Sequence, residues 1–238
     1  RTTNKMTYNF STTPYDELTQ ADKKRYHKLQ LKDQLAELQT IFKGVLETKE
    51  KSKTLIKKYK NSTDQFSQDY INNLIQRETE TENNALMSLT DKATRALDKA
   101  KQAVEAGHAI TDLDDVRLPN AIRIIQASGA DIKPEVARRL VNEFTGDQTA
   151  LTMLQGILKA VGTSYDGGLD KMIYDVEDTF RQAGDAIRDH LTSQEGSLNY
   201  VAKRVAVIAK GEGCDFPEVF DPTEVDRATR RGAGLPVD

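Results

Sequence analysis

The chain has 238 residues, of which 37% are hydrophobic and 30% are charged, and its net charge is −3. This length can bury a core without covalent crosslinks, and the single cysteine excludes an internal disulfide. No apolar run of about 18 residues predicts a membrane span, and the opening residues, RTTNKMTYNF, lack the apolar stretch of a secretion signal. Abundant helix formers and the lack of alternating apolar runs predict an all-α fold.

The first part of the chain predicts a polar arm followed by very long helices. Residues 1–13 are rich in Thr and Asn, which favours an extended arm. Thr13 and Pro14 fit the cap and the first position of a helix, and no further proline occurs before Pro119. We therefore expect a long helical hairpin or coiled coil over residues 14–107.

Apolar residues in the first of these helices recur with the spacing of a heptad seam. They are Leu31, Leu35, Leu38, Phe42 and Val45. The seam is interrupted at Lys49 and Ser52, and a polar core position can fix the register of a coiled coil. Such a seam needs a second helix to cover it, and we predict that these five residues form an interface with another chain.

Lysines are concentrated just after this seam, between Leu46 and Asn61. They are Lys49, Lys51, Lys53, Lys57, Lys58 and Lys60. Residues 1–60 carry a charge balance of +7 and the remainder −10, so the stretch suits either a solvated or partner-facing helix or a sequence-independent contact with phosphates. It has no arginine and one aromatic residue, Tyr59, and these features favour the first interpretation because nucleic-acid sites combine arginines with aromatic rings.

The segment KNSTDQF predicts the turn of the hairpin, because Asn, Ser, Thr and Asp compete with the helix backbone. A second helical run of nearly equal length follows to about residue 106. Its polar stretch QRETETENN, residues 76–84, is expected to lie opposite the seam. Either the second helix is broken there, or the seam faces another chain.

After Gly107 the sequence changes to short segments with frequent helix punctuation, which predicts a compact helical bundle over residues 108–210. Residues 110–210 are expected to fold alone. Pro119 and Pro134 each fit the start of a helix. One amphipathic helix is expected from Leu169 to Leu191. Residues 211–238 form a tail rich in proline and glycine.

No group of residues in the sequence predicts catalysis. Glu105 and His108 form a single Glu-x-x-His, whereas di-iron bundles use the unit twice. The acidic residues 112–115 lack the glycine and glutamate spacing of a calcium loop. Cys214 has no base beside it in the sequence. We therefore predict no enzyme activity, no catalytic residue, no cofactor and no metal site.

The long Lys/Gln/Asn-rich helices from Leu18 to Val104, joined to a small helical domain, resemble structural proteins of tailed bacteriophages. The resemblance implies a multi-copy component of the capsid, its scaffold or its attachments, located in the virion or the host cytoplasm. Its partners would be copies of itself or other structural proteins, with no membrane. It carries over no functional residues.

Two other classes of protein fit the same features. A cytoplasmic adaptor built on a coiled coil would share the long helices and the seam. A nucleic-acid-associated protein would use the lysines from Lys49 to Lys60 for weak, non-specific contacts. Salt-dependent binding to random DNA would favour the second class.

Overall fold

The computed structural model describes residues 14–110, 116–163, 169–193 and 197–223, and in this part of the chain every regular element is helical. The elements are η1 (Tyr15–Glu17), α1 (Gln20–Lys60), α2 (Gln68–His108), α3 (Arg117–Ser128), η2 (Gly129–Asp131), α4 (Pro134–Asn142), α5 (Gln148–Ala160), α6 (Leu169–Met172), α7 (Val176–His190) and α8 (Leu198–Gly211). The all-α prediction is confirmed. The expected extended N-terminal segment, residues 1–13, lies outside the described residues.

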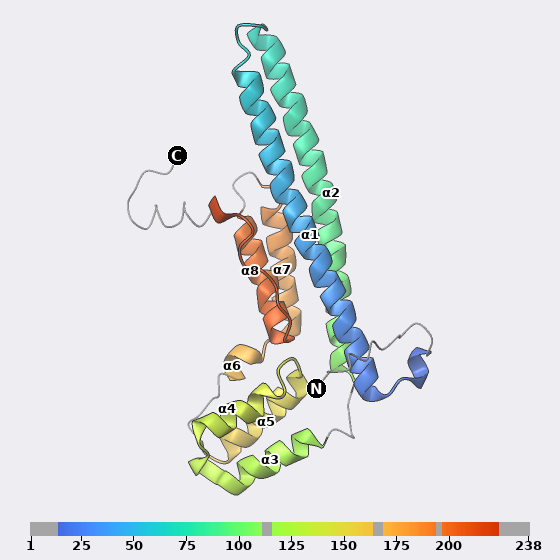
Figure 1. Ribbon diagram of the computed structural model, residues 1–238, viewed down its shortest axis with the longest axis vertical. Helices are drawn as coiled ribbons and strands as arrows, with labels where there is room; N and C mark the ends of the chain where they lie inside the picture. The colour runs from blue at the N-terminus through green and yellow to red at the C-terminus, as the bar shows by residue number, and fades with distance from the viewer. Residues whose placement is uncertain (1–13, 111–115, 164–168, 194–196, 224–238) are drawn as a thin grey trace, which may run out of the picture.

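Helices α1 and α2 form the long antiparallel hairpin (Figure 1). Each has 41 residues, which corresponds to about 60 Å at 1.5 Å per residue. The expected turn is present, and Ser67 caps α2 by accepting a hydrogen bond from the backbone of Tyr70. The predicted helix start at Pro14 is wrong: Leu18 is extended, and Thr19 caps α1 through the backbone N–H of Asp22.

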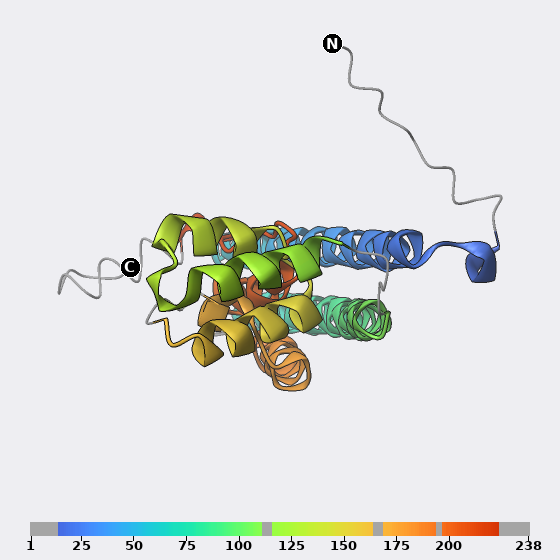
Figure 2. The same ribbon diagram turned by 90° about the horizontal axis from the view of Figure 1, so that it is seen from below.

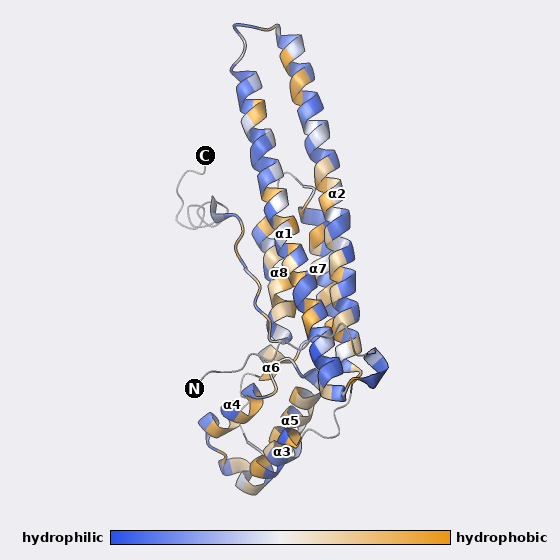
Figure 3. Cartoon of the chain, turned by 45° about the vertical axis from the view of Figure 1, so that its right-hand side comes forward, coloured by the Kyte–Doolittle hydropathy of each residue, from blue (hydrophilic) through white to orange (hydrophobic). Residues whose placement is uncertain are grey.

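Helices α7 and α8 lie against the lower half of this hairpin (Figure 1) and complete a four-helix bundle. Its core takes side chains from α1, α2, α7 and α8, including Leu97, Phe180, Val201 and Val205. Above this level the hairpin consists of two helices, and hydrophilic residues predominate along α1 (Figure 3). No helix in the described part of the chain combines the length and apolarity needed to cross a membrane.

Helices α3, α4, α5 and α6 form a second, smaller core below the end of the bundle (Figure 1), and seen from below they lie in front of it (Figure 2). Its fully buried residues include Ile125, Val141, Leu151 and Leu154. The expected bundle over residues 108–210 is therefore divided between two cores. Helices α3, α4, α5 and α6 pack with one another, whereas α7 and α8 return to the hairpin, so residues 108–210 lack the surface that α7 and α8 need in order to bury their apolar faces.

The division between the two cores falls within the helix expected from Leu169 to Leu191. This segment is broken after Met172, and α7 begins anew with Asp175 as its cap, whose carboxylate accepts a hydrogen bond from the N–H of Asp178. Met172 packs against the small core, whereas Val176 packs against the bundle. A continuous helix could not pack its first part against the small core and its second part against the bundle.

The first part of the tail runs back along α8 (Figure 1) and belongs to the bundle. Phe216 and Phe220 pack against its core. Asn199 of α8 holds this segment: its amide donates to the carbonyl of Asp221 at 2.7 Å and accepts from the N–H groups of Phe220 and Asp221. The expectation of a plain Pro/Gly tail is thus corrected for residues 212–221.

Candidate interaction site

The five seam residues expected to bind another chain are buried inside this one. Leu38, Phe42 and Val45 have no exposed surface, and Leu31 and Leu35 are 2% and 3% exposed. They belong to the core shared with α2, α7 and α8. The predicted interface is corrected accordingly: the heptad pattern identifies a face that must be buried, and α7 and α8 of the same chain bury it.

The polar stretch 76–84 lies nearer the turn than the sequence argument placed it. A side chain at Gly44 would meet Leu89 at 3.6 Å, so residues 76–84, which come earlier in α2, lie opposite the region of α1 beyond Gly44. This region contains the polar positions Lys49 and Ser52, and α2 continues through the stretch without a break. Polar residues of the two helices therefore lie at the same level, which neither expected alternative included.

We call residues 49–82 the arm, the part of the hairpin that continues beyond α7 and α8. Lys49 marks its base, because its ammonium group donates to the carbonyl of Ser193, just after α7, at 3.0 Å. The other lysines of the predicted basic stretch are exposed. They are Lys51, Lys53, Lys57, Lys58 and Lys60. Among the described residues, no ion pair involves these five lysines.

The opposite helix of the arm has the opposite charge. Between Gln68 and Glu82 it carries four acidic residues and one arginine. Glu78 and Glu82 are half-buried, and Glu80 is exposed and accepts a hydrogen bond from Gln76 at 2.9 Å. The arm therefore has a basic side on α1 and an acidic side on α2.

Two aromatic rings are exposed at the tip of the arm. Phe66 is 46% exposed and Tyr70 is 49% exposed, and their ring centroids are 5.1 Å apart. Neither ring was predicted to belong to an interaction site, although a phenylalanine that directly follows a predicted polar turn is a signal. Half-exposed aromatic pairs of this kind are enriched at protein interfaces.

The seam inside the arm is only partly closed. Ile71 is 1% exposed, whereas Ile56, Tyr59, Leu74 and Ile75 are half-buried. Ser52 is also buried, and its hydroxyl has no hydrogen-bond partner. Because only two helices are present here, each of them keeps an uncovered flank.

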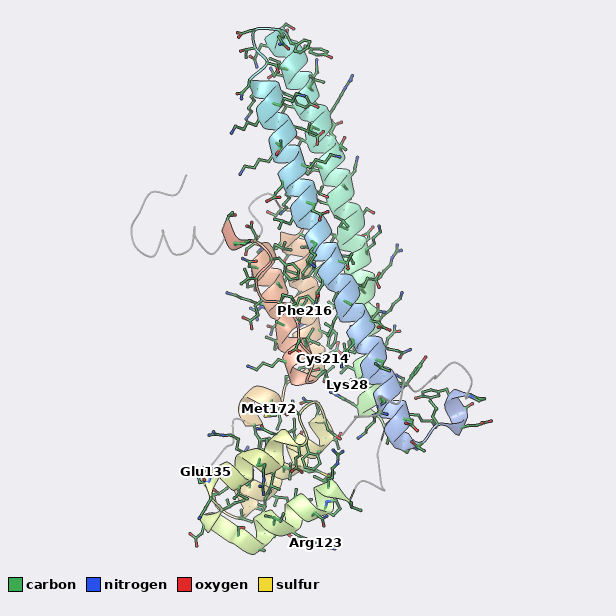
Figure 4. All side chains as sticks on the ribbon, viewed as in Figure 1. Lys28, Arg123, Glu135, Met172, Cys214 and Phe216 are labelled. Atoms are coloured by element: carbon green, nitrogen blue, oxygen red, sulfur yellow. The ribbon has the colours of Figure 1, made fainter. Side chains whose placement is uncertain are left out.

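A second candidate is a cavity of about 440 Å³ where the bundle meets the small core. Its wall includes Lys24, Lys28, His108, Phe144, Asp147 and Glu212. Lys24 pairs with Asp147 at 2.9 Å. Figure 4 places Lys28 of α1 near Cys214 at the base of α8. Burial raises the pKa of the Cys214 thiol, although Lys28 and Lys32 oppose this effect, so the thiol is a weak nucleophile.

Glu212 is the central polar group of this junction. It is 7% exposed. Its carboxylate accepts a hydrogen bond from Tyr174 Oη at 2.6 Å, and His108 Nε2 lies 3.0 Å from the same oxygen. Burial, together with the neighbouring negative charge of Glu212, raises the pKa of Tyr174 far above its ordinary value. Gln148 bonds to the carbonyls of Met172 and Gly211 nearby. These satisfied contacts tie the two cores together, so the junction has a structural role.

No group of three His, Cys, Asp or Glu side chains in the described residues could hold a metal ion. Comparisons with protein-family models, with curated proteins and with solved structures each gave no match to this chain. The candidate site is therefore defined by geometry alone, and the arm is its strongest candidate.

Proposed function

We propose that the protein is a structural or assembly protein that acts through protein–protein contacts made by the arm. The observation that carries the proposal is the extension of α1 and α2 beyond the four-helix bundle (Figure 1), with charged flanks and the exposed rings of Phe66 and Tyr70 at the tip. Lys49 ties the base of this arm to the bundle through its hydrogen bond to the carbonyl of Ser193.

The residues of the arm suit a protein partner. Aromatic side chains commonly contribute most of the binding energy of an interface when a partner covers them. Lysines without an ion pair remain solvated in the free chain and can meet acidic groups of a partner, which raises the association rate and selects the partner.

Photo-crosslinking tests this proposal directly. A photoreactive phenylalanine analogue replaces Tyr70 at the tip in one variant and Lys92, exposed on α2 beside the bundle, in a matched control. We expect protein adducts of defined mass from position 70 and few from position 92. Adducts that contain nucleic acid, or no adducts from position 70 in cells, would contradict a protein-binding arm.

Contact with phosphates stays the alternative, and the five exposed, unpaired lysines of the arm favour it. The acidic residues of α2 and the absence of arginine from residues 49–60 weigh against it. Binding to random DNA that weakens steeply with salt, and that is lost when Lys57 and Lys58 become glutamate, would support this alternative.

The role in a phage virion implied by the resemblance is a narrower proposal. It predicts many copies of the chain in purified particles, which quantitative mass spectrometry of such particles would detect. A non-viral adaptor would instead be found with one host protein at a fixed ratio.

A further inference from the structure

We propose that one face of the arm binds an acidic amphipathic helix of a partner protein. This face, which we call the lysine face, consists of Lys53, Ile56, Lys57 and Lys60. The inference rests on the proposed function and names the chemistry of the partner. The partner helix would cover Ile56 with apolar side chains and place carboxylates against the three lysines.

The lysine face continues the side of α1 that is buried lower in the chain. Lys53 and Lys60 follow Phe42 by about three and about five full helical turns, and Lys57 lies between them. Phe42 has no exposed surface and packs in the core of the bundle, whereas all three lysines are exposed. In the arm, the side of α1 that packs inside the bundle lower down therefore carries lysines.

An apolar line forms the floor of this face. Ile56 follows Leu38 by about five turns, and Ile75 of α2 precedes Ala93 by about five turns. Leu38 and Ala93 have no exposed surface, because the helices of the bundle meet there. Ile56 and Ile75 are only half-buried, so the apolar line continues into the arm and is covered there only in part.

The charge of the face favours carboxylates in the partner. Among the described residues, no ion pair involves Lys53, Lys57 or Lys60. Glu82, which is half-buried, lies on the adjoining side of α2, about five turns before the buried Ala100. One carboxylate beside three ammonium groups leaves an excess of positive charge, which selects an acidic partner.

The lower half of the hairpin shows how it holds such a helix. There α7 buries Phe180 in the shared core, and its Glu177 pairs with Lys101 of α2 at 2.5 Å. Lys49 marks the upper end of this arrangement, because it bonds to the carbonyl of Ser193 just after α7. Above this level no described helix takes the place of α7 and α8 (Figure 1). A helix of the partner fits this place.

Selection from a displayed library tests the inference on the full chain. The library members are single amphipathic helices of about five turns. They share one apolar stripe and carry Glu, Gln or Lys at the positions beside it. We expect the wild-type chain to enrich helices with Glu beside the stripe. Fluorescence anisotropy then measures the dissociation constant of the best of these helices, made as a labelled peptide.

Two variants with equal changes in charge separate the lysine face from the rest of α1. Lys53→Glu with Lys57→Glu reverses the lysine face, and the control, Lys51→Glu with Lys58→Glu, changes exposed lysines on the opposite side of the helix. The first should weaken binding of the selected helix by about tenfold or more, because like charges then face each other, and the control by less than about threefold. Selection on the first variant should enrich Lys beside the stripe instead.

Circular dichroism checks that both variants stay helical. Lys53→Gln with Lys57→Gln replaces the first variant if it unfolds, and it should weaken binding in the same direction. Failure to enrich any helix, enrichment without a preference for Glu, or equal weakening by the two variants would each overturn the acidic helix as the partner.

The remaining outcomes separate this inference from the proposed function. Equal weakening by the two variants, together with tighter binding of labelled random DNA than of any selected helix, would assign the lysines to phosphates. Protein crosslinks from position 70 would still support a protein-binding arm if no acidic helix binds. Their absence would overturn the proposed function as well.

Discussion

The ring of Phe42, in the middle of α1, meets the ring of Phe220 edge to face, with centroids 5.4 Å apart and planes at 79°. Phe216 approaches the same ring at 5.9 Å. The first long helix and the last described segment of the chain thus share one contact. The apolar seam of α1 is not fully covered by α2 alone, and residues near the C-terminal end of the described chain help to cover it.

Phe42→Ala should therefore destabilise the whole bundle. Phe42 has no exposed surface, and replacing a buried phenylalanine with alanine costs about 3–5 kcal/mol. Denaturant unfolding measures the loss. Met87→Ala, at a position that is 60% exposed on α2, is the control and should change the unfolding free energy by less than about 0.5 kcal/mol. Equal, small effects at the two positions would mean that the seam is not a core.

Asn199→Ala should release the tail segment. The amide of Asn199 makes three hydrogen bonds to the backbone of Phe220 and Asp221, and buried backbone groups left without partners cost about 1–3 kcal/mol. Hydrogen exchange at the amides of these two residues should accelerate, whereas Asn73→Ala, on the exposed side of α2, should leave them unchanged. Unaltered exchange in the Asn199 variant would show that Phe216 and Phe220 hold the segment by themselves.

Gly211→Ala should weaken the junction between the two cores. A β-carbon at Gly211 would lie 2.3 Å from the ring of Tyr174, so the ring would have to move and strain its bond to Glu212. We expect the free energy of unfolding, measured with denaturant, to fall by more than about 1 kcal/mol. Gly156→Ala in α5 is the opposite case, because a β-carbon at this position would meet nothing within 4 Å. Its free energy of unfolding should rise by up to about 1 kcal/mol because alanine favours helices. A neutral Gly211 variant would place Tyr174 elsewhere in solution.

The buried Tyr174 predicts a loss of stability in alkali. Its folded pKa is raised above the ordinary value near 10, so the unfolded chain releases this proton first as the pH rises. The stabilising effect of Tyr174 is complete below about pH 10 and then declines by about 1.4 kcal/mol per pH unit. Tyr174→Phe has no phenol proton at this position, so the advantage of the wild type over Tyr174→Phe should shrink as the pH rises from about 10 to 11. A constant advantage would show that the phenol is not buried beside Glu212.

The sequence predicts the local elements well because their signals are local. The turn near Asn61, the two equal helices and the start of α4 at Pro134 follow from caps, breakers and periodicity, whereas α3 begins at Arg117, two residues before the expected Pro119. The start of α1 was predicted wrongly because Pro14 is typical of a first helical position. Thr19 followed by Asp22 three positions later is also a capping signal, and it is the one that the structure uses.

The partner of the seam could not be predicted for a different reason. A heptad pattern shows which face of α1 is apolar and does not show whether α2, α7, α8 or another chain covers it. The break after Met172, which sends α7 back to the hairpin, has a weak sequence signal. Asp175 can cap a helix, but the apolar spacing of Met172, Ile173 and Val176 continues across the break. The role of Phe216 and Phe220 was missed because a Pro/Gly-rich context suggested an unpacked tail.

The central claim is that α1 is a core helix up to the level of Lys49 and belongs to the partly covered arm from Lys49 to Lys60. Hydrogen exchange along α1 tests this claim most directly. In dilute solution, amides from residue 31 to 47 should exchange only through global unfolding, and those from 52 to 60 should exchange faster through local opening. Protection that is uniform along α1 in the dilute monomer, or fast exchange at residues 31–47, would contradict the account.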